Sequence, residues 1–410
     1  MGSEEKQEKH KMRRVRKTFS LSNMSKGGRA ALARSRSIDH QIDEDREKKQ
    51  KEVQLLLLGG AGSGKSTFIK QLQLHYGGGF PESEREIFAE QILKNMTEGL
   101  VLIVEQMEVL GIKYERVETQ QNTIELLGKH PRVSMKLILS RMAEDEEAAL
   151  KSQSNTKNAD LSPQMSNLRM GNEFTKSEVD MIQEIWNDAG VQCCYASRHK
   201  FGLERLTQGE EYFLENIDRV TRKNYTPTVQ DILYIRQPTL GVIENTFEID
   251  NLIYRVIDVA GQKSLRKKWI HFFEAVTAVM FFVPLSGYDE VLEEDTTANC
   301  LQDSLQAFHE VSHNHYLEKT DMILFLNKKD LFMQKVKKVS IANCFPAYKG
   351  ENTPEASLKF IKDQFIQHKP GHKQVYIHVS CAVDVKMMRD ILSSVIDIIV
   401  EINLRKTQNL

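Results

Sequence analysis

The sequence predicts an α/β fold: a mostly parallel six-stranded sheet with an all-α helical domain inserted into it. Short apolar runs of strand length alternate with longer amphipathic stretches, which is the pattern of a parallel sheet covered by helices. Between residue 83 and about residue 223, in contrast, apolar residues recur at helical spacing. A glycine-rich turn directly after the first apolar run predicts a binding loop at the start of the sheet.

Six segments have the composition of strands, either as continuous apolar runs or as runs that alternate around a turn. The second and third segments flank Asp250-Asn251, as the two arms of a hairpin do. A long amphipathic helix, Val385–Leu404, is predicted near the end of the chain. The expected strands are Leu55–Leu58, Val242–Ile249, Leu252–Val259, Ala278–Leu285, Met322–Leu326 and Val375–Val379.

Composition also divides the chain into domains. The sheet domain is predicted over residues 52–78 and 232–410, and the inserted helical domain over residues 79–231. Residues 143–174, which are polar and poor in apolar side chains, are expected to form a mobile insertion.

The N-terminal part of the chain is basic. Residues 1–28 are predicted to be a disordered basic extension, and residues 29–51 a charged helix that leads into the first strand. Such a tail would favour peripheral association with an anionic membrane face, although a merely solvated tail explains the same composition.

Bulk composition excludes several classes of protein. The chain has 410 residues, enough for about two or three domains, and a formal net charge of −1, so we expect no nucleic-acid partner. Its five cysteines show neither metal-ligand spacing nor an even framework, which indicates a reducing compartment. We find no signal peptide and no apolar stretch long enough for a transmembrane segment, and we therefore expect a cytoplasmic location. The basic N-terminal residues would place the protein at the cytoplasmic face of the plasma membrane.

The stretch Gly59–Ser66 fits G-x-x-x-x-G-K-[ST], the pattern of a phosphate-binding loop. Its backbone N–H groups would point at phosphate oxygens, Lys65 would reach the β- and γ-phosphates, and the Ser66 hydroxyl would ligate Mg²⁺. A chance glycine turn is the alternative, but an apolar strand before it and an amphipathic helix after it favour a nucleotide site. The predicted nucleotide-binding residues of this stretch are Gly60, Ala61, Gly62, Ser63, Gly64, Lys65, Ser66 and Thr67.

A second motif, Asp258-Val259-Ala260-Gly261-Gln262, follows the third strand. Asp258 would hold Mg²⁺ through water, the Gly261 N–H would sense the γ-phosphate, and Gln262 would orient an attacking water. Alone, the motif is no more than a strand-ending turn. Its spacing behind a phosphate-binding loop favours the functional interpretation.

A third motif, Asn327-Lys328-Lys329-Asp330, predicts guanine specificity. The Asp330 carboxylate can accept hydrogen bonds from guanine N1–H and N2–H₂, whereas adenine offers neither donor and would leave a buried carboxylate unpaired. Asn327 would brace the site, and the aliphatic stem of Lys328 would lie along the base. The pattern by itself is common in surface turns, so its position after a buried strand is what favours guanine.

Three further groups complete the predicted site. The backbone N–H groups of Cys381 and Ala382, after the last strand, would face the guanine O6. Thr239 precedes the second strand and would complete the Mg²⁺ shell. Arg236, three residues earlier, would stabilise the charge that develops during phosphoryl transfer, although a lone arginine in a loop is usually a solvated charge.

These motifs together resemble the α subunits of heterotrimeric G proteins, over nearly the whole chain after the first tail. The run Asp258–Trp269 is the most specific part of the match. The resemblance implies a Ras-like P-loop GTPase domain with an inserted helical domain, GTP/GDP and Mg²⁺ as cofactors, and hydrolysis of GTP to GDP and phosphate. It also implies that Arg236 and Gln262 are catalytic, and that Leu233 and Tyr234 contact the nucleotide.

The same resemblance implies the partners. A βγ dimer would bind the N-terminal helix and the switch around Lys263–Trp269, and effectors and a GTPase-accelerating protein would bind the GTP-ordered switches. A seven-helix receptor or another exchange factor would engage the terminal helix and Asn403–Leu410. The chain would then transduce receptor signals as a molecular switch.

Two departures from the family pattern suggest an alternative. Ala61 stands where the family has glycine, and its methyl group would crowd the γ-phosphate and slow hydrolysis. Gly62 replaces a glutamate that pairs with the catalytic arginine, so nucleotide would leave more readily. Both favour a poorly hydrolysing, nucleotide-held scaffold that binds βγ or effectors. A third class, an ATP-using P-loop protein, is disfavoured by the residues Asn327–Asp330.

Overall fold

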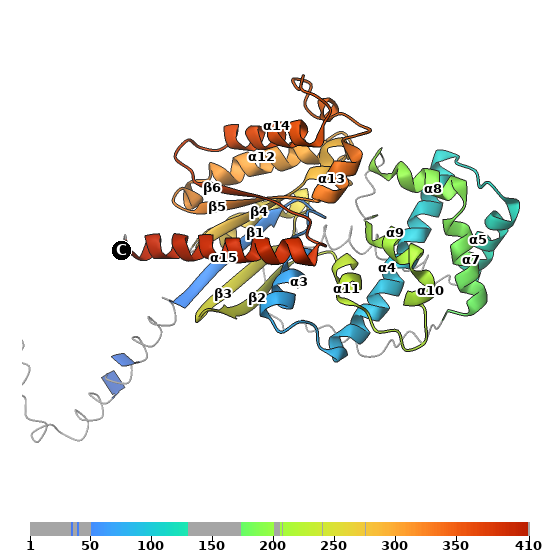
Figure 1. Ribbon diagram of the computed structural model, residues 1–410, viewed down its shortest axis with the longest axis horizontal. Coiled ribbons are helices and arrows are strands. Elements are labelled where there is room, and N and C mark those ends of the chain that lie inside the picture. The colour runs from blue at the N-terminus through green and yellow to red at the C-terminus, as the bar shows by residue number, and fades with distance from the viewer. Residues whose placement is uncertain are drawn as a thin grey trace, which may run out of the picture. The chain divides into compact units, whose positions relative to one another are not determined.

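The computed structural model describes residues 34–35, 39–40, 51–129, 174–200, 206, 208–239, 241–274 and 276–408 (Figure 1). The predicted basic extension and nearly all of the predicted N-terminal helix lie outside these ranges, as does the predicted mobile insertion apart from Phe174. None of the helices in the described ranges combines the length and the apolar character needed to span a bilayer.

All six predicted strands are present in one sheet, with the order β2-β3-β1-β4-β5-β6. Strand β4 runs parallel to β1 and β5, and β6 runs parallel to β5. The predicted mostly parallel α/β sheet is therefore confirmed. The strands are β1 (Glu52–Gly59), β2 (Val242–Ile249), β3 (Leu252–Val259), β4 (Ala278–Pro284), β5 (Asp321–Asn327) and β6 (Val375–Val379).

Helices follow most of the strands along the chain. The stretch predicted to be helical from residue 83 to about residue 223 is largely helical within the described ranges. The terminal helix extends about one turn beyond its predicted end. In sequence order the α-helices are α3 (Lys65–Tyr76), α4 (Glu82–Leu110), α5 (Val117–Lys129), α7 (Lys176–Trp186), α8 (Ala189–Ala196), α9 (Gln208–Glu215), α10 (Ile217–Val220), α11 (Val229–Tyr234), α12 (Cys300–Ser312), α13 (Lys329–Lys335), α14 (Pro354–Gln367) and α15 (Val385–Gln408). Short 3₁₀ segments are η2 (Arg198–Lys200), η3 (Lys263–Phe272), η4 (Leu285–Asp289), η5 (His315–Leu317) and η6 (Ile341–Asn343).

The hairpin between β2 and β3 turns on two residues. Asp250 and Asn251 both have positive φ, 50° and 62°. A two-residue turn with this backbone matches the twist of an antiparallel pair, and Asn and Asp tolerate the left-handed region better than most residues. The local sequence alone therefore accounts for this turn.

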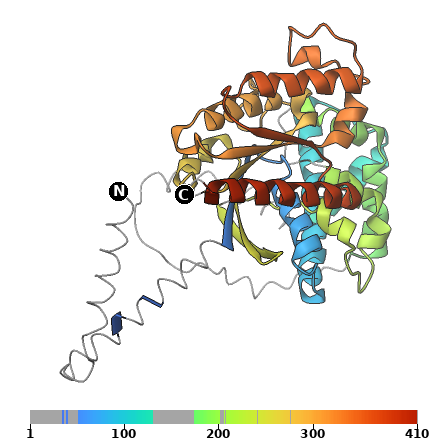
Figure 2. The same cartoon turned by 60° about the vertical axis from the view of Figure 1, so that its left-hand side comes forward.

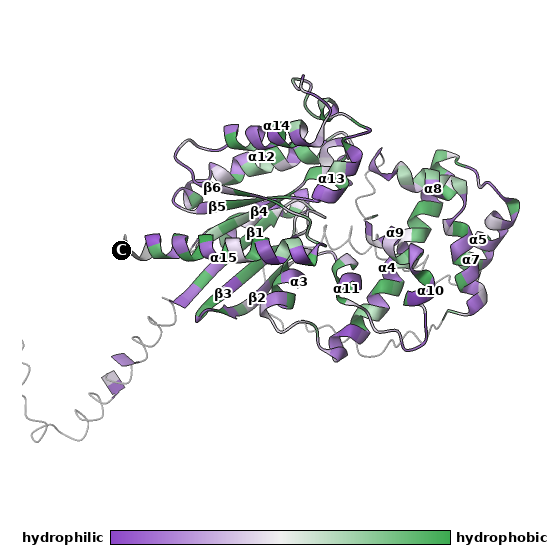
Figure 3. Cartoon of the chain, in the orientation of Figure 1, coloured by the Kyte–Doolittle hydropathy of each residue, from purple (hydrophilic) through white to green (hydrophobic). Residues whose placement is uncertain are grey.

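The sheet has helices on both faces, as Figures 1 and 2 show: α12 and α14 on one side, α3 and α15 on the other. Successive strand residues point to opposite faces, so Phe281 packs on Phe308 of α12 at a ring distance of 5.5 Å. Its neighbour Phe282 packs on Phe68 of α3 at 5.2 Å. Every residue of β4 is buried, as both covered faces require, and hydrophobic residues are concentrated on the strands in Figure 3.

A second core lies among the inserted helices α4, α5 and α7 to α10. Its members are spaced as amphipathic helices require, and Trp186 meets Tyr195 edge to face at 5.1 Å. This core is separate from the cluster between β1, β4, β5, α12 and α14. Its fully buried side chains include Ile92, Met96, Ile103, Ile185, Val191, Phe213 and Ile217.

Phe68 packs the binding-loop helix α3 on the sheet. It is 1% exposed and contacts the rings of Phe282 and Phe325 at 5.2 and 5.1 Å. We expect Phe68→Ala to lower the free energy of unfolding by about 3–5 kcal/mol, because it removes a buried ring and leaves a cavity. Urea unfolding followed by tryptophan fluorescence measures this. Ile87→Ala, at a site that is 67% exposed, is the control and should change stability by less than about 0.5 kcal/mol; equal effects would contradict the packing argument.

Candidate functional site

Four of the predicted motifs lie at the carboxyl ends of strands, and the Arg236–Thr239 segment precedes β2. The glycine-rich loop follows β1, the Asp258 motif ends β3, the Asn327 motif follows β5, and Cys381 comes just after β6. Because neighbouring parallel strands end at one edge of the sheet, these loops converge there. The sheet topology thus brings together segments that lie far apart in the sequence.

The glycine-rich loop takes a backbone that ordinary residues avoid. Gly64 has a φ of 104° and stands directly before α3. A Cβ at this position would collide with the side-chain amide of Asn327. Glycine is therefore required here both for its backbone conformation and for the close approach of the guanine-motif residue.

Lys65 lies inside the loop, 5% exposed. Its ammonium donates hydrogen bonds to the carbonyl oxygens of Gly59 and Gly60, both at 2.9 Å. Burial lowers the pKa of Lys65 to about 8; the carboxylate of Asp258 opposes this shift, and the nearby Arg266 guanidinium adds to it. A cation held in this position can bind phosphate oxygens above the loop.

Three predicted metal ligands meet at one point. The Ser66 hydroxyl lies 3.1 Å from the Thr239 hydroxyl and donates to Asp258 Oδ2 at 3.2 Å. Thr239 donates to the same oxygen at 3.3 Å. The other carboxylate oxygen, Oδ1, is buried and has no hydrogen-bond partner among the described residues. Two hydroxyls and a carboxylate are hard oxygen ligands, so this set fits Mg²⁺, which prefers few protein ligands together with phosphate and water.

The charge of Asp258 is costly in this position. The residue is fully buried, and burial raises the pKa of its carboxyl above the usual range, while Lys65 and the hydroxyls of Ser66 and Thr239 act in the opposite direction. A divalent cation bound here would supply positive charge to the carboxylate and to phosphate oxygens. The three oxygen ligands, together with the unpaired Oδ1 of Asp258 among the described residues, therefore form a position that suits a divalent cation.

The segment after β3 packs tightly on the phosphate-binding loop. A Cβ on Gly261 would lie 2.5 Å from the carbonyl oxygen of Gly59, so only glycine fits. The Trp269 indole donates to the carbonyl oxygen of Ala260 at 3.0 Å. Gln262, half-buried, lies between these two anchors at the start of η3. Its backbone is thus fixed beside the loop.

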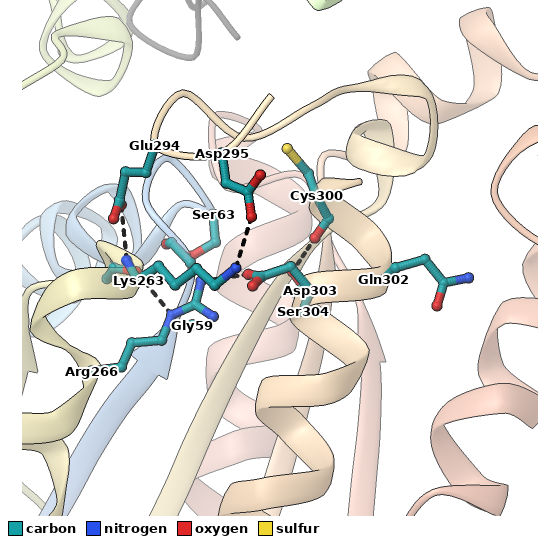
Figure 4. Close-up of polar contacts among 12 residues, drawn as sticks. Gly59, Ser63, Lys263, Arg266, Glu294, Asp295, Cys300, Gln302, Asp303 and Ser304 are labelled. Atoms are coloured by element: carbon teal, nitrogen blue, oxygen red, sulfur yellow. Dashed lines mark hydrogen bonds and ion pairs between the residues drawn. The ribbon is translucent and has the colours of Figure 1, made fainter. Parts of the chain in front are cut away.

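Ion pairs hold the same segment from the side of α12 (Figure 4). Arg266 donates to Asp303 of α12 at 2.6 Å and to the Gly261 carbonyl oxygen at 3.3 Å. Glu294 accepts the backbone N–H of Lys263 at 2.8 Å, and the Lys263 ammonium pairs with Asp295 at 3.1 Å. These side chains connect the position of Gln262 to the loop before α12.

Asn327 connects three loops on the opposite side of the site. Its amide donates to the carbonyl oxygen of Ser63 at 2.8 Å, and its carbonyl oxygen accepts from the Ser380 hydroxyl at 3.1 Å and from the Ala382 N–H at 3.0 Å. These three hydrogen bonds are the kind of contact that the predicted bracing role of Asn327 requires. The Ala382 N–H, which we expected to face guanine, is instead donated to Asn327, an arrangement that local sequence does not reveal.

The remaining guanine-side residues surround Asp330. Lys328 has a φ of 58° and begins the turn into α13, and Asp330 Oδ2 accepts from Gln208 of α9 at 3.3 Å. Cys381 is 8% exposed, and burial raises the pKa of its thiol to about 12, with the Asp330 carboxylate adding to the effect. A thiol in this state is a packing residue rather than a nucleophile.

Helix α11 leads directly to Arg236. The carboxylate of Asp231, fully buried, receives both guanidinium nitrogens of Arg219 at 2.7 Å and the hydroxyl of Tyr225 at 2.6 Å. Burial alone would raise the pKa of Asp231, but these hydrogen bonds outweigh it and hold the pKa far below its usual range. The start of α11 is therefore rigidly attached to α10 by a charge-assisted network.

The other predicted site residues take less specific positions. Leu233 is buried in α11, and Tyr234 stacks on Tyr212 of α9 with ring centres 4.2 Å apart. Thr67 and Ala61 are half-buried, and Gly62 is exposed with a φ of 63°. Direct contacts join the loop residues to Asn327, the three oxygen ligands to one another, and Ala382 to Asn327.

Sequence reasoning missed residues that lie far from any motif. Asn95 of α4 pairs with the backbone of Arg236, and Lys70 of α3 donates to the carbonyl oxygens of Ile232 and Ile235 at 2.9 and 2.8 Å. One signal for Asn95 was available: an asparagine, a poor helix former, interrupts the apolar face of a long helix.

Comparison with known proteins places these residues in context. A family model described as G-protein alpha subunit matches residues 32–399. A curated protein named guanine nucleotide-binding protein G(o) subunit alpha, from Caenorhabditis elegans, is 35% identical over 383 residues, covering 93% of this chain and 98% of the relative. Proteins of the same name from Lymnaea stagnalis and Planorbella trivolvis are each 35% identical over 378 residues, covering 92% of this chain and 96% of the relative.

The contacts of Asn327 generate a prediction. Asn327→Ala leaves a buried carbonyl, hydroxyl and N–H without their partner, so we expect it to lower the free energy of unfolding by about 2–4 kcal/mol. Urea unfolding without added nucleotide separates this effect from ligand binding. The control is Asn352→Ala: the Asn352 amide donates to the Val336 carbonyl oxygen at 2.8 Å, and we expect its loss to cost about 1 kcal/mol. Equal losses in the two variants would show that Asn327 does not join the loops.

Proposed function

Because this chain belongs to the G-protein α-subunit family, we propose that it is a molecular switch that binds guanine nucleotides and hydrolyses GTP to GDP and phosphate in the presence of Mg²⁺. The observation that carries the proposal is the convergence of Ser66, Thr239 and Asp258 within 3.3 Å of one another, beside Lys65. Loops that meet in this way fit the phosphates of a nucleoside triphosphate and its cation.

Each part of the proposed reaction has a residue suited to it. Lys65 and the loop N–H groups bind the β- and γ-phosphates, and Ser66, Thr239 and Asp258 (the last through water) would hold Mg²⁺, which neutralises charge on the phosphate oxygens. Gln262 orients a water whose oxygen forms the new bond to the γ-phosphorus as the bond to the β-phosphate oxygen breaks. The water proton leaves with the phosphate product or passes to solvent.

Arg236 is the second catalytic residue in this proposal. Its guanidinium would stabilise the negative charge that accumulates on the leaving β-phosphate oxygen. Catalysis in such a site is mainly positioning and electrostatic stabilisation, since little covalent chemistry is asked of the protein. The anchored backbones of Gln262 and Arg236 therefore support this assignment.

Guanine selection rests on Asp330, Lys328 and Asn327. The carboxylate of Asp330 would accept two donors that guanine has and adenine lacks. Asn327 holds this loop against Ser63, so binding of the base and of the phosphates depends on one connected structure. Cys381 and Ala382 lie beside the base in this arrangement, and Leu233 and Tyr234 line it from α11.

Domain boundaries and partners remain part of the proposal. We assign residues 52–78 and 232–410 to the GTPase domain and residues 79–231 to the helical domain. A βγ dimer and effectors would bind the exposed face of η3, where Ile270 is 45% exposed, and an exchange factor would bind α15. The basic N-terminal residues would place the protein at the cytoplasmic face of the plasma membrane.

A second candidate is a nucleotide-held scaffold with little turnover. Gly62 favours it: the residue is exposed and offers no carboxylate to an arginine across the nucleotide. The retained Gln262, Arg236 and Thr239 favour the hydrolytic switch. The two functions differ in the rate of the chemical step rather than in nucleotide specificity.

The main test pairs GTPγS binding with single-turnover GTP hydrolysis on purified protein. We expect GTP, but not ATP at a hundredfold excess, to displace bound GTPγS, and we expect hydrolysis to fall at least about a hundredfold in Arg236→Ala and in Gln262→Ala. Ile87→Ala, at an exposed site on α4 outside the proposed machinery, is the control. Displacement of GTPγS by ATP would refute guanine specificity. Unchanged hydrolysis in both variants would refute the proposed mechanism, and the nucleotide-held scaffold would then be the remaining candidate.

The two unusual loop residues give a further prediction. We expect Ala61→Gly to raise the single-turnover rate about tenfold, which corresponds to about 1.4 kcal/mol of activation free energy. Gly62→Glu has room for its side chain, because a Cβ there has no neighbour within 4 Å, although its positive φ adds local strain. We expect it to slow GDP release by about two- to fivefold through an exposed ion pair with Arg236. A quenched single-turnover assay measures the hydrolysis rate of Ala61→Gly, and release of mant-GDP measures the GDP dissociation rate of Gly62→Glu. Unaltered rates would show that neither Ala61 nor Gly62 affects the reaction.

A further inference from the structure

A single asparagine of the inserted helices holds the backbone of the proposed catalytic arginine. Asn95 lies in the middle of α4 and is 8% exposed. Its amide nitrogen donates to the carbonyl oxygen of Arg236 at 3.0 Å, and its amide oxygen accepts the backbone N–H of Arg236 at 2.9 Å. Both polar groups of one side chain are thus paired with both polar groups of one backbone residue.

This pairing restrains Arg236 in the way that a neighbouring strand would. A side-chain amide presents a donor and an acceptor in one plane, as a peptide group does, so two hydrogen bonds fix both position and orientation. Asparagine is a weak helix former, and a buried amide is costly unless it is paired. Asn95 on the buried face of α4 therefore needs hydrogen-bond partners for its amide, and the backbone of Arg236 provides them.

A second anchor approaches from the opposite side. Lys70, on the helix that follows the phosphate-binding loop, donates to the carbonyl oxygens of Ile232 and Ile235. The chain just before Arg236 is therefore attached to α3, and Arg236 itself is attached to α4. The next two residues, Gln237 and Pro238, are exposed, and Thr239 follows them.

We propose that Asn95 is a positioning residue for GTP hydrolysis. It fixes the backbone from which the Arg236 side chain extends, and it thereby makes the reaction depend on helix α4. This inference rests on the catalytic role proposed for Arg236. The guanidinium must reach a charge that forms only in the transition state, and displacement of a catalytic group by about 1 Å can cost up to a hundredfold in rate. Nucleotide affinity depends chiefly on the loop and guanine residues, which Asn95 does not touch.

A double-mutant cycle tests this on the full chain, loaded with GTP and started by Mg²⁺ in a single turnover. We expect Asn95→Ala to slow hydrolysis about tenfold, with GTPγS affinity changed less than threefold. In an Arg236→Ala background the same substitution should have no further effect beyond twofold, because Asn95 acts through the side chain that is absent there. Thr97→Ala is the matched control on α4: its hydroxyl donates to the carbonyl oxygens of Leu93 and Lys94 in its own helix, at 2.9 and 3.1 Å, and hydrolysis should be unchanged.

The outcomes separate this inference from the proposed function. If Arg236→Ala slows hydrolysis but Asn95→Ala does not, or if Asn95→Ala slows it by the same factor in both backgrounds, the positioning role is overturned and the proposed function stands. If Arg236→Ala leaves the rate unchanged, the mechanism fails and this inference with it. Should Asn95→Ala not bind GTPγS, the same cycle is run with Asn95→Ser, which retains a smaller polar group, and is judged by the same criteria.

Discussion

One buried carboxylate organises the phosphate side of this protein. Asp258, the penultimate residue of β3, has no exposed surface, and its Oδ2 accepts hydrogen bonds from Ser66 and Thr239. A charge in such a position is unfavourable unless positive or polar groups surround it. Ser66, in the helix after the phosphate-binding loop, and Thr239, in the segment before β2, supply these polar groups at the end of β3. Three segments that lie far apart in the sequence therefore meet at the Asp258 carboxylate.

The guanine side is organised by neutral hydrogen bonds instead. Asn327 contacts Ser63, Ser380 and Ala382, so the loop after β5 touches both the phosphate-binding loop and the loop after β6. A small shift in any of the three would leave a buried polar group unpaired. In the proposed function, the residues for the base and those for the phosphates are therefore parts of one hydrogen-bonded structure.

The inserted helices contribute to the site rather than simply covering it. Asn95 holds the backbone of Arg236, Gln208 donates to Asp330, and the Arg219–Asp231 pair fixes the start of α11. These contacts reach the two ends of the nucleotide site, the arginine and the guanine carboxylate. Movement of these helices would change the surroundings of both residues.

The sequence alone determined the sheet, the inserted helices, the hairpin at Asp250-Asn251 and the identity of the nucleotide motifs. These depend on local periodicity, turn chemistry and short spacing, which act within a few residues. The pairing of Asn95 with Arg236, and the use of the Ala382 N–H by Asn327, were decided only by the tertiary structure. Both join segments that are 141 and 55 residues apart, and no local pattern encodes which distant polar group a buried amide will meet.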